Sequence, residues 1–323
     1  KEEASETDKD ADPGSALTEE NFERFRKMVT SSLFKEHFEN APMELKSFLF
    51  TQYRMHPQIM QVVNQFYENR LVCGLPDPDG KSLGSDPRGH RLHRMTLSGV
   101  QGVPYVTPEQ HAIWIDSAHD PERKRHYERR DGHSSKANDL EAALIAKTLL
   151  DIELACRQQG YGTAGKKPKS VGVVTFYGRQ IKVIREAVKR ARAQTGIDLT
   201  ATRVDINTVD RYQGQERPII IVSMVRNPPW KLSPRANTAQ FERINVAFSR
   251  AQELLVVVGA RDVFCSYPVQ LPFLDRPGSR SVEVYRGIVE EVQRFGGVFQ
   301  SEQILTQNEY HKFAANQDGR GQR

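Results

Sequence analysis

Short runs of apolar residues alternate with amphipathic segments along the second half of the chain. The continuous, largely β-branched runs predict strands at residues 113–116, 171–175, 205–209, 219–225 and 254–259. The segments between and after them predict helices at residues 138–158, 178–194, 241–250 and 285–295. Strands that are apolar on both faces are typical of parallel sheets covered on both sides. The alternation therefore predicts an α/β fold: a doubly wound parallel sheet with helices on both faces and right-handed crossovers.

The first part of the chain follows a different pattern. Residues 1–17 are too polar to offset the entropy of ordering, and they predict a disordered acidic leader. Apolar residues at helical spacing predict a helical connector over residues 18–45. A strand at residues 47–51 and a helix starting at Pro57, a residue suited to a first helical turn, open a main domain expected to cover residues 46–300.

Two further segments lack a regular period. Residues 76–112 are expected to be a variable loop or insertion, because residues 76–108 alone contain five prolines and five glycines. A connection this long without periodicity is usually functional or disordered. The last segment, residues 301–323, is rich in Gln and Asn and predicts a flexible tail.

Composition and charge narrow the class of protein. The chain has 323 residues, and no stretch approaches the ~20 apolar residues that span a bilayer, so no membrane partner is expected. Its three cysteines lie far apart and its first residues are polar, which indicates an intracellular protein, cytoplasmic or nuclear. Residues 1–20 carry eight acidic and two basic side chains, so the net charge of +5 becomes +11 over residues 21–323. That charge fits either a protein that binds a polyanion or an ordinary basic protein.

Four segments place polar side chains at the ends of predicted strands. They are residues 52–57, 174–180, 208–216 and 243–251. Their arginines can bind phosphate with a fixed fork of donors, Gly214 can bring a backbone N–H close to an anion, and Glu216 can hold a sugar hydroxyl. Each feature alone has a structural explanation, such as an ion pair for Arg54 or a turn for Gly214. Because ligands gather at the carboxyl ends of strands in such sheets, the four segments together favour a site for a nucleotide and a nucleic-acid strand.

Taken in order, the segments resemble motifs of the second, C-terminal RecA-like domain of superfamily 1 helicases, in the up-frameshift/senataxin-like branch. The most specific signature is Gln-Tyr-Arg-Met-His-Pro at residues 52–57. Val-Asp-x-x-Gln-Gly-x-Glu at residues 209–216 and Asn-Val-Ala-x-Ser-Arg-Ala at residues 245–251 follow in that family's order. The resemblance implies the sheet of RecA-like, P-loop NTPase-type domains, and the function it implies is the C-terminal motor half of an ATP-dependent helicase or translocase.

The resemblance covers about residues 30–265 and departs from the family at residues 76–108 and at Phe176, where the family often has Pro. It implies that Arg250 is the arginine finger, which stabilises charge on the transferring phosphoryl group, and that Arg54 reaches the γ-phosphate. The ATP-binding residues it implies are Gln52, Tyr53 on the adenine, Gly214 through its backbone and Glu216 on the ribose. The residues it implies for binding single-stranded RNA or DNA are Thr175, Tyr177, Thr208 and Asn245, the last by supporting the motif geometry.

Two groups that this chemistry needs are missing from the sequence. The chain has no Gly-x-x-x-x-Gly-Lys-Ser/Thr phosphate loop and no Asp-Glu pair after an apolar strand. In the family these groups belong to the N-terminal RecA-like domain of the same protein, which is the expected partner. ATP and Mg²⁺ are expected as cofactors of the full-length protein and not as tight ligands of this chain, which alone is expected not to hydrolyse ATP. The alternative is a non-catalytic, helicase-like scaffold that binds nucleic acid or protein.

Histidines and basic residues cluster in the less regular regions. The histidines are His90, His93, His119, His126 and His133. Without a cysteine beside them they predict solvated loop residues, with a zinc site as the weaker alternative, so no metal site is assigned. The basic clusters at residues 88–94 and 123–130 could extend a nucleic-acid track or be solvated loops.

Overall fold

The computed structural model describes residues 41–47, 49–131, 135–233, 236–276 and 278–314. The chain divides into two units, which we describe separately. In the smaller unit, the described residues up to Leu49 contain one turn of 3-10 helix, η2 (Met43–Leu45). The leader predicted at residues 1–17 and nearly all of the connector predicted at residues 18–45 lie outside the described residues.

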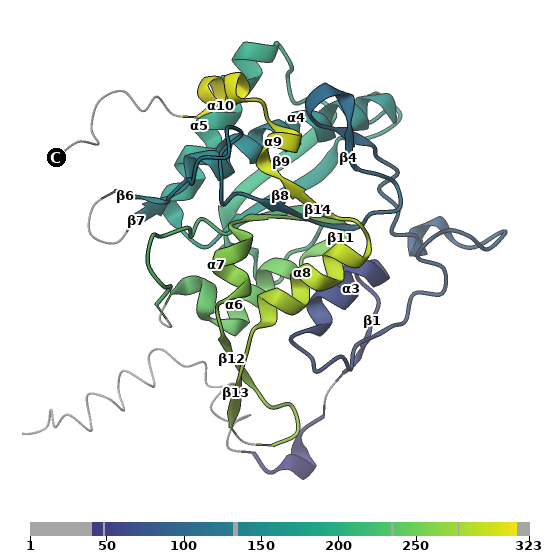
Figure 1. Ribbon diagram of the computed structural model, residues 1–323. Coiled ribbons are helices and arrows are strands. Elements are labelled where there is room, and N and C mark those ends of the chain that lie inside the picture. Colours follow the sequence, from purple (N-terminus) through teal and green to yellow (C-terminus); the bar gives the residue numbers. More distant parts are fainter. Residues whose placement is uncertain (1–40, 48, 132–134, 234–235, 277, 315–323) are drawn as a thin grey trace, which may run out of the picture. The chain divides into compact units, whose positions relative to one another are not determined.

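The larger unit is built on a six-stranded parallel sheet (Figure 1). The strand order is β14 (Val298–Gln300), β5 (Ala112–Asp116), β11 (Ala251–Gly259), β10 (Arg217–Ser223), β8 (Lys169–Thr175) and β9 (Thr202–Thr208). The register aligns apolar residues across the sheet, since Ile221 pairs with Val173 on one side and with Val256 on the other. All five strands predicted from apolar runs are present, and β14 at the edge was not predicted.

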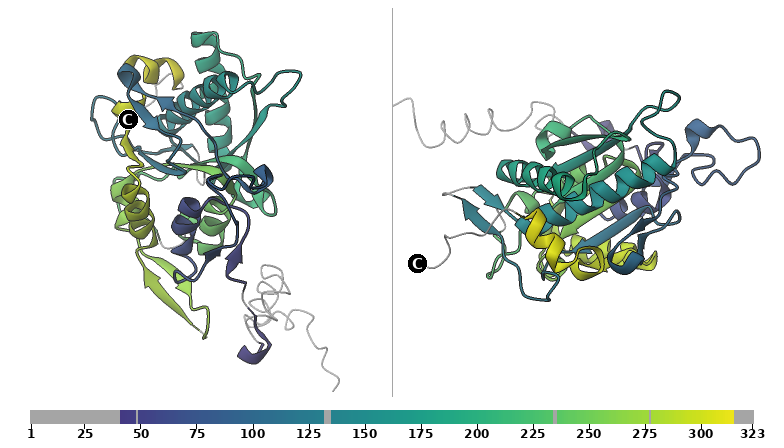
Figure 2. Two further views of the ribbon diagram at one scale, coloured as in Figure 1. Left: turned by 90° about the vertical axis from the view of Figure 1, so that its right-hand side faces the viewer. Right: turned by 90° about the horizontal axis from the view of Figure 1, so that it is seen from above.

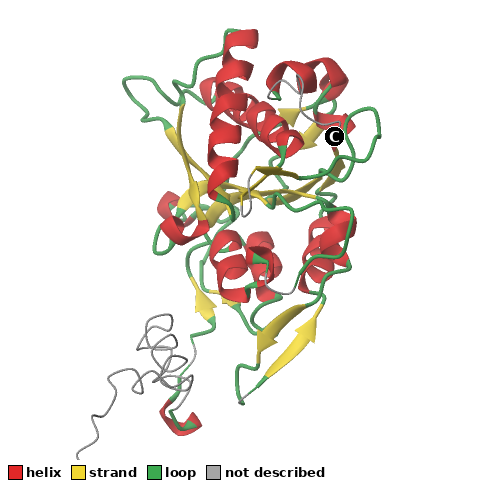
Figure 3. Cartoon of the chain, turned by 90° about the vertical axis from the view of Figure 1, so that its left-hand side faces the viewer, coloured by secondary structure: helices red, strands yellow, loops and turns green. Residues whose placement is uncertain are grey.

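Helices cover both faces of this sheet, as Figures 1 and 3 show. One face carries α4 (Asp139–Gln158), α5 (Gly178–Thr195) and α10 (Gln307–Phe313), and the other carries α3 (Pro57–Asn64), α6 (Phe241–Phe248), α7 (Arg261–Cys265) and α8 (Val284–Arg294). Side chains alternate along each strand, so Ile219 and Ile221 enter the first core while Ile220 and Val222 enter the second. The predicted RecA-like, doubly wound α/β sheet is confirmed.

Local sequence sets where two of these helices begin. The Asn138 side chain accepts a hydrogen bond from the backbone N–H of Glu141 at 3.0 Å, so α4 starts with the predicted cap. Pro57 is the first residue of α3, and Nδ1 of His56 accepts from the backbone N–H of Gln58 at 3.2 Å. The motif at residues 52–57 is therefore joined rigidly to the helix that follows it.

The strand predicted at residues 47–51 is wrong in length and position. Only β1 (Thr51–Gln52) forms, and it pairs in parallel with β2 (Val72–Cys73) outside the main sheet. The strand ends there because the Gln52 side chain accepts hydrogen bonds from the backbone N–H groups of Arg54 and Met55, which turns the chain.

The prediction of a flexible tail at residues 301–323 is wrong for residues 301–314. This segment forms α9 (Ser301–Ile304) and α10, and α10 begins with a capping box at Thr306. Tyr310 and Phe313 are buried in the core on the side of α4 and α5. Tyr310 and Phe313 lie less than one helical turn apart and fix the segment to the sheet domain. The otherwise polar composition of the segment did not indicate these two buried residues.

The segment at residues 76–112 is mostly loop, as predicted, and its regular elements are short. It contains η3 (Pro87–Gly89), β3 (Leu97–Ser98), η4 (Val100–Gly102) and β4 (Pro104–Val106), followed by the start of β5. Met95, Leu97 and Tyr105 are fully buried in the core beside α4. Apolar anchors, rather than helical or strand periodicity, hold this segment against the domain.

The remaining elements are short. They are the hairpins β6 (Arg129–Asp131) with β7 (Ser135–Ala137) and β12 (Val269–Pro272) with β13 (Ser279–Val282), and the turns η5 (Val209–Tyr212) and η6 (Asn237–Ala239). The β12–β13 hairpin extends away from the sheet on the side of α8 (Figure 2). Among the described residues, no helix is both long and apolar enough to cross a membrane.

Candidate functional site

Three predicted site segments meet at the amino-terminal ends of β10 and β11. Glu216 directly precedes β10, and Arg250 directly precedes β11. The two strands are parallel neighbours, and the N–H of Arg217 donates to the carbonyl of Arg250 at 3.0 Å. The nucleotide-site residues therefore lie at the opposite edge of the sheet from the carboxyl edge that the sequence predicts, because these residues precede their strands instead of following them.

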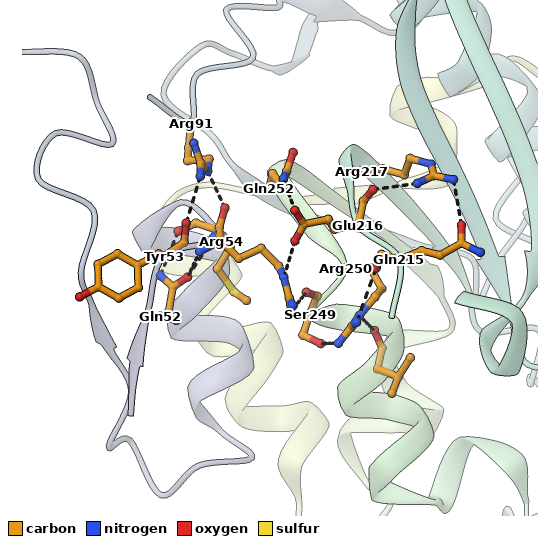
Figure 4. Close-up of polar contacts among 12 residues, drawn as sticks. Gln52, Tyr53, Arg54, Arg91, Gln215, Glu216, Arg217, Ser249, Arg250 and Gln252 are labelled. Carbon is orange, nitrogen blue, oxygen red and sulfur yellow. Dashed lines mark hydrogen bonds and ion pairs between the residues drawn. The ribbon is translucent and has the colours of Figure 1, made fainter. Parts of the chain in front are cut away.

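Arg54 joins this edge from the segment between β1 and α3. Its Nε donates to Oε2 of Glu216 at 2.7 Å, and its Nη1 donates to the carbonyl of Ser249 at 3.1 Å (Figure 4). The other carboxylate oxygen of Glu216 accepts from Nε2 of Gln252 at 2.9 Å. The side chains of Arg54 and Glu216 are 36% and 47% exposed, so both are accessible from one surface. We call the surface formed by Arg54, Glu216 and Arg250 the arginine wall.

Arg250 is the second guanidinium of the arginine wall. Its Nε donates to the carbonyl of Val246 at 3.1 Å, and its Nη2 donates to Oγ of Ser249 at 2.8 Å. Within the described part of the chain it forms no ion pair with a carboxylate. Burial, and secondly the positive charge of Arg54, lower the pKa of Arg250 from its ordinary value. Two guanidinium groups thus share this wall with one nearby carboxylate, Glu216.

The other predicted ATP-binding residues have distinct positions. The side chain of Gln52 is engaged in hydrogen bonds within its own turn, where its Nε2 donates to the carbonyl of Met55 at 3.0 Å. Tyr53 is 64% exposed, and its ring points away from Arg54 in Figure 4. The ring lies against Gly74, where a Cβ would come within 2.4 Å of it. Gly214 is exposed with φ of 78°, a left-handed conformation that favours glycine.

Arg91, which belongs to the basic cluster predicted at residues 88–94, contacts the backbone of the motif at residues 52–57. Its guanidinium donates to the carbonyl of Arg54 and, at 3.0 Å, to the carbonyl of Tyr53 (Figure 4). It also donates to the carbonyls of Arg88 at 3.0 Å and His90 at 2.8 Å. The segment at residues 76–112 is therefore fastened to the backbone of the most specific motif through one planar side chain.

A stack of three buried histidines lies beside the same motif. His56 and His111 stack with ring centroids 3.4 Å apart, and His93 meets His111 edge-on at 4.8 Å. Nε2 of His56 lies 2.8 Å from a carboxylate oxygen of Asp79. Burial lowers the pKa of His93 to about 4 and of His111 to about 3, and also lowers that of His56. These rings are neutral packing groups at pH 7.

The prediction of solvated loop histidines is wrong for His93, which is 1% exposed in that stack. His90 and His126 are half-buried and hydrogen-bonded. His119 is exposed as predicted, and His133 lies outside the described residues. Over the described ranges, no group of three or more His, Cys, Asp or Glu side chains could hold a metal ion.

The residues predicted to bind a single strand lie mainly at the carboxyl edge of the sheet. Thr175 and Thr208 pair across the ends of β8 and β9. Thr175 is fully buried with no hydrogen-bond partner for its hydroxyl, while Thr208 is half-buried. Tyr177 is 9% exposed, and Asn245 lies in α6 instead, donating to the hydroxyl of Tyr67 at 2.8 Å. The structure brings the first three together and separates Asn245 from them.

A buried carboxyl network supports this carboxyl edge. Glu141 is fully buried and accepts from the hydroxyl of Ser223 at 2.6 Å and from the N–H of Val225 at 2.8 Å. Its other oxygen accepts from Oγ of Ser117 at 3.3 Å. Burial raises the pKa of Glu141 to about 8, so the carboxyl is largely protonated at neutral pH. The network ties the ends of β5 and β10 to the start of α4.

Most of the basic residues at 123–130 form ion pairs with carboxylates of the same chain. Arg123 pairs with Glu302, Arg125 pairs with Asp262, and Arg129 pairs with Asp139. Arg130 instead lies over the ring of Trp230, 4.6 Å from its centroid. The prediction that this cluster extends a nucleic-acid track is therefore restricted to Arg130, which faces a hollow at the carboxyl edge.

Comparison with known proteins agrees with this architecture. The domain is an α/β domain with a parallel sheet of RecA-like type, and two arginines lie at one edge of that sheet. The family model described as AAA domain matches residues 29–262, so the chain belongs to that family.

The chain is also similar to several helicases. It is 27% identical over 255 residues to the DNA replication ATP-dependent helicase/nuclease JHS1 of Arabidopsis thaliana, covering 77% of this chain and 16% of that protein. It is 30% identical over 238 residues to the DNA replication ATP-dependent helicase/nuclease DNA2 of Xenopus tropicalis, covering 72% of this chain and 20% of that protein. The chain therefore spans about a fifth of the length of these relatives or less. Their names support a helicase-family domain but not the up-frameshift/senataxin-like branch.

Proposed function

We propose that this chain is the C-terminal motor half of an ATP-dependent helicase or translocase that acts on single-stranded DNA. The observation that carries the proposal is the arginine wall, on which Arg54 and Arg250 lie together. Among the described residues, Arg54 pairs with Glu216 and Arg250 pairs with no carboxylate. Arg250 acts as the arginine finger, Arg54 contacts the γ-phosphate, and Glu216 holds the ribose. The names of the relatives favour DNA over RNA as the strand.

The charge balance of the wall supports a polyphosphate ligand. Guanidinium forks match phosphate oxygens in geometry and stay charged. Burial, and secondly the positive charge of Arg54, lower the pKa of Arg250, so the charged form of Arg250 carries a penalty at this wall. An anion between them removes that penalty and adds charge-assisted hydrogen bonds. Because Arg250 is already fixed by Val246 and Ser249, it needs little reorganisation when charge develops on the transferring phosphoryl group.

The rest of the phosphate-binding machinery belongs to another part of the same protein under this proposal. The chain has no phosphate loop, and its described residues contain no cluster of three or more His, Cys, Asp or Glu side chains that could hold a metal ion. An N-terminal RecA-like domain would bind ATP and Mg²⁺ and close against the arginine wall. Closure and release on hydrolysis would then move the strand stepwise. This chain alone would bind ATP weakly and would not hydrolyse it at an appreciable rate.

The proposal is tested by ATPase and strand-displacement assays of the complete protein on matched DNA and RNA substrates. We expect ATP turnover that depends on a DNA strand and is lost in Arg250→Ala. Lys166→Ala is the matched control, because Lys166 is also a basic residue but lies at the turn before β8, near Tyr161. A wild-type protein that binds the strand but never turns over ATP would contradict the motor and favour the scaffold.

A further inference from the structure

A basic hollow of about 430 Å³ lies at the carboxyl edge, on the opposite edge from the arginine wall. Its lining comes from the β6–β7 hairpin, the loop after β8 and the loop after β10. The lining residues with charged or aromatic side chains are Arg130, Lys136, Tyr177, Arg226, Trp230 and Lys231. None of the helicase-like motifs includes Trp230, Arg130, Lys136 or Lys231.

Trp230 is a large aromatic side chain presented to solvent. It is 52% exposed, with the Arg130 guanidinium 4.6 Å from its ring centroid. The loop that carries it is anchored on both sides, since Leu232 is 7% exposed in the core and Val225 is held by Glu141. Val225 has φ of 69°, which is strained for a β-branched residue and is characteristic of functional loops. The loop is therefore anchored at both ends and strained at Val225, and it exposes the indole of Trp230 at its tip.

Three of the four cations that line the hollow form no ion pair within the described residues. Arg226 pairs with buried Glu128 at 2.7 Å, so its charge is compensated. Lys136, Lys231 and Arg130 form no ion pair in the part of the chain that the structure describes. Burial, and secondly the charge of Arg226, lower the pKa of Lys136. Like the arginine wall, the hollow therefore favours an anionic ligand.

We propose that this hollow binds an unpaired nucleotide of a single-stranded nucleic acid, with its base stacked on Trp230 and its flanking phosphates at Lys136 and Lys231. This inference rests on the proposed function and adds the place where the strand is held. The Arg130 guanidinium swings off the indole as the base takes its place, and then contacts a phosphate. A base in a duplex has both faces covered by its neighbours, so the hollow selects single strands and exposed ends.

An acidic protein segment is the competing occupant of a basic hollow. It would use the lysines but would gain little from the exposed indole face or from the Tyr177 ring, which lies 6.0 Å from Nζ of Lys136. Stacking on aromatic side chains is worth about 1–3 kcal/mol per base in proteins that bind single strands. The pairing of aromatic faces with unneutralised cations therefore favours nucleic acid over peptide.

The chain contains its own reporter for this site. It has two tryptophans, and Trp114 is fully buried in the sheet while Trp230 is exposed. Titration of the chain with a deoxythymidine oligonucleotide is expected to quench the Trp230 part of the intrinsic fluorescence. Trp230→Phe should keep binding and leave only unquenched Trp114 emission. By fluorescence anisotropy of a labelled oligonucleotide, Trp230→Ala should bind about tenfold more weakly or worse.

Variants of the two lysines and titrations with other ligands distinguish a single strand from a duplex or an acidic peptide as the occupant of the hollow. Lys136→Ala with Lys231→Ala should reduce the salt dependence of binding, while Lys166→Ala should leave it unchanged. A uridine oligonucleotide distinguishes RNA from DNA as the source of the strand, and a matched duplex should quench much less. Quenching by polyglutamate in place of the oligonucleotides, equal quenching by duplex, or unchanged affinity in Trp230→Ala would overturn the inference.

These outcomes are independent of the test of the motor. Strand-dependent ATP turnover that needs Arg250, together with unchanged strand affinity in Trp230→Ala, would sustain the proposed function and remove this site. Quenching of Trp230 by the single strand, together with ATP turnover that ignores Arg250, would sustain the site and remove the arginine finger.

Discussion

Arg54 and Glu216 are 162 residues apart in the sequence, yet Nε of Arg54 donates to Oε2 of Glu216 at 2.7 Å. The two side chains are therefore partners of one another in this structure. Both would have to contact ATP under the proposed function, with Arg54 on the γ-phosphate and Glu216 on the ribose. Under that proposal, the ion pair holds the two side chains at the wall, and nucleotide binding would exchange it for contacts with the ligand.

Replacing Glu216 should affect nucleotide selection more than stability. Because the pair is about half-exposed, Glu216→Gln should change the free energy of unfolding by less than about 1 kcal/mol. A carboxylate on the ribose favours ATP over 2′-deoxy-ATP, so the variant should lose that preference. The KM values of the complete protein for the two nucleotides measure it. Equal preference in wild type and variant would refute the ribose role.

Arg91 should act as a positioning residue for the motif at residues 52–57. Arg91→Ala removes hydrogen bonds to the carbonyls of Tyr53 and Arg54, so hydrogen exchange of the backbone amides in this motif should become faster. Arg91→Lys should not restore protection, because an ammonium cannot reproduce a planar fork that reaches several carbonyls. Arg88→Ala is the control, since its side chain is 91% exposed and pairs with nearby Asp86.

In the complete protein, Arg91→Ala should raise the KM for ATP more than it lowers kcat, since it loosens ground-state binding and leaves Arg250 in place. Unchanged exchange in residues 52–57 together with unchanged KM would show that the segment at residues 76–112 does not position the motif.

The main layers of the fold could be predicted because burial dictates their sequence. The runs around Ile219 and Leu254 are apolar on both faces, which is typical of strands in a parallel sheet that is covered on both sides. The resemblance predicted which residues form the arginine wall. The sequence did not predict that they lie at the amino-terminal ends of β10 and β11. Which edge of the sheet a motif occupies depends on whether the motif precedes or follows its strand. The ends of predicted strands are uncertain by several residues, so the sequence does not decide this.

Other features leave no periodic signal in the sequence. Arg91 and His93 lie in a Pro- and Gly-rich segment whose structure rests on isolated anchors such as Met95. The stack of His56 on His111 joins residues far apart in the chain and depends on tertiary contact alone. Trp230 resembles any exposed loop aromatic until Arg130 and Lys136 are seen beside it.

The buried carboxyl of Glu141 should make stability depend on pH. Its pKa of about 8 in the folded protein lies above its ordinary value of 4.5, so the folded state holds a proton that the unfolded state releases. This contribution is fully present below pH 4.5, and it is lost as pH rises through about 8. Glu141→Gln, which mimics the protonated acid, should therefore flatten the fall in unfolding free energy between pH 5 and pH 8.

Urea denaturation at several pH values measures this effect, with Glu290→Gln as an exposed control. A pH profile that is the same in Glu141→Gln and wild type would show that Glu141 is ionised in the folded protein.

The C-terminal helix α10 should contribute substantially to stability. Phe313 is 1% exposed in the core beside α4 and α5, so Phe313→Ala should cost about 3–5 kcal/mol of unfolding free energy. Lys312→Ala, at an exposed neighbouring position, should cost little. Chemical denaturation compares the two variants. Equal stability of Phe313→Ala and wild type would mean that α10 is not docked on the domain in solution.

The arginine finger is tested most directly by single-turnover ATP hydrolysis in the complete protein with saturating DNA strand. Arg250→Ala is expected to slow the chemical step by roughly 10³-fold or more while strand affinity and unfolding free energy stay close to wild type. Arg250→Lys should recover little of the rate, because a single ammonium cannot replace the guanidinium fork. A rate of hydrolysis in Arg250→Ala within a few-fold of wild type would contradict the account.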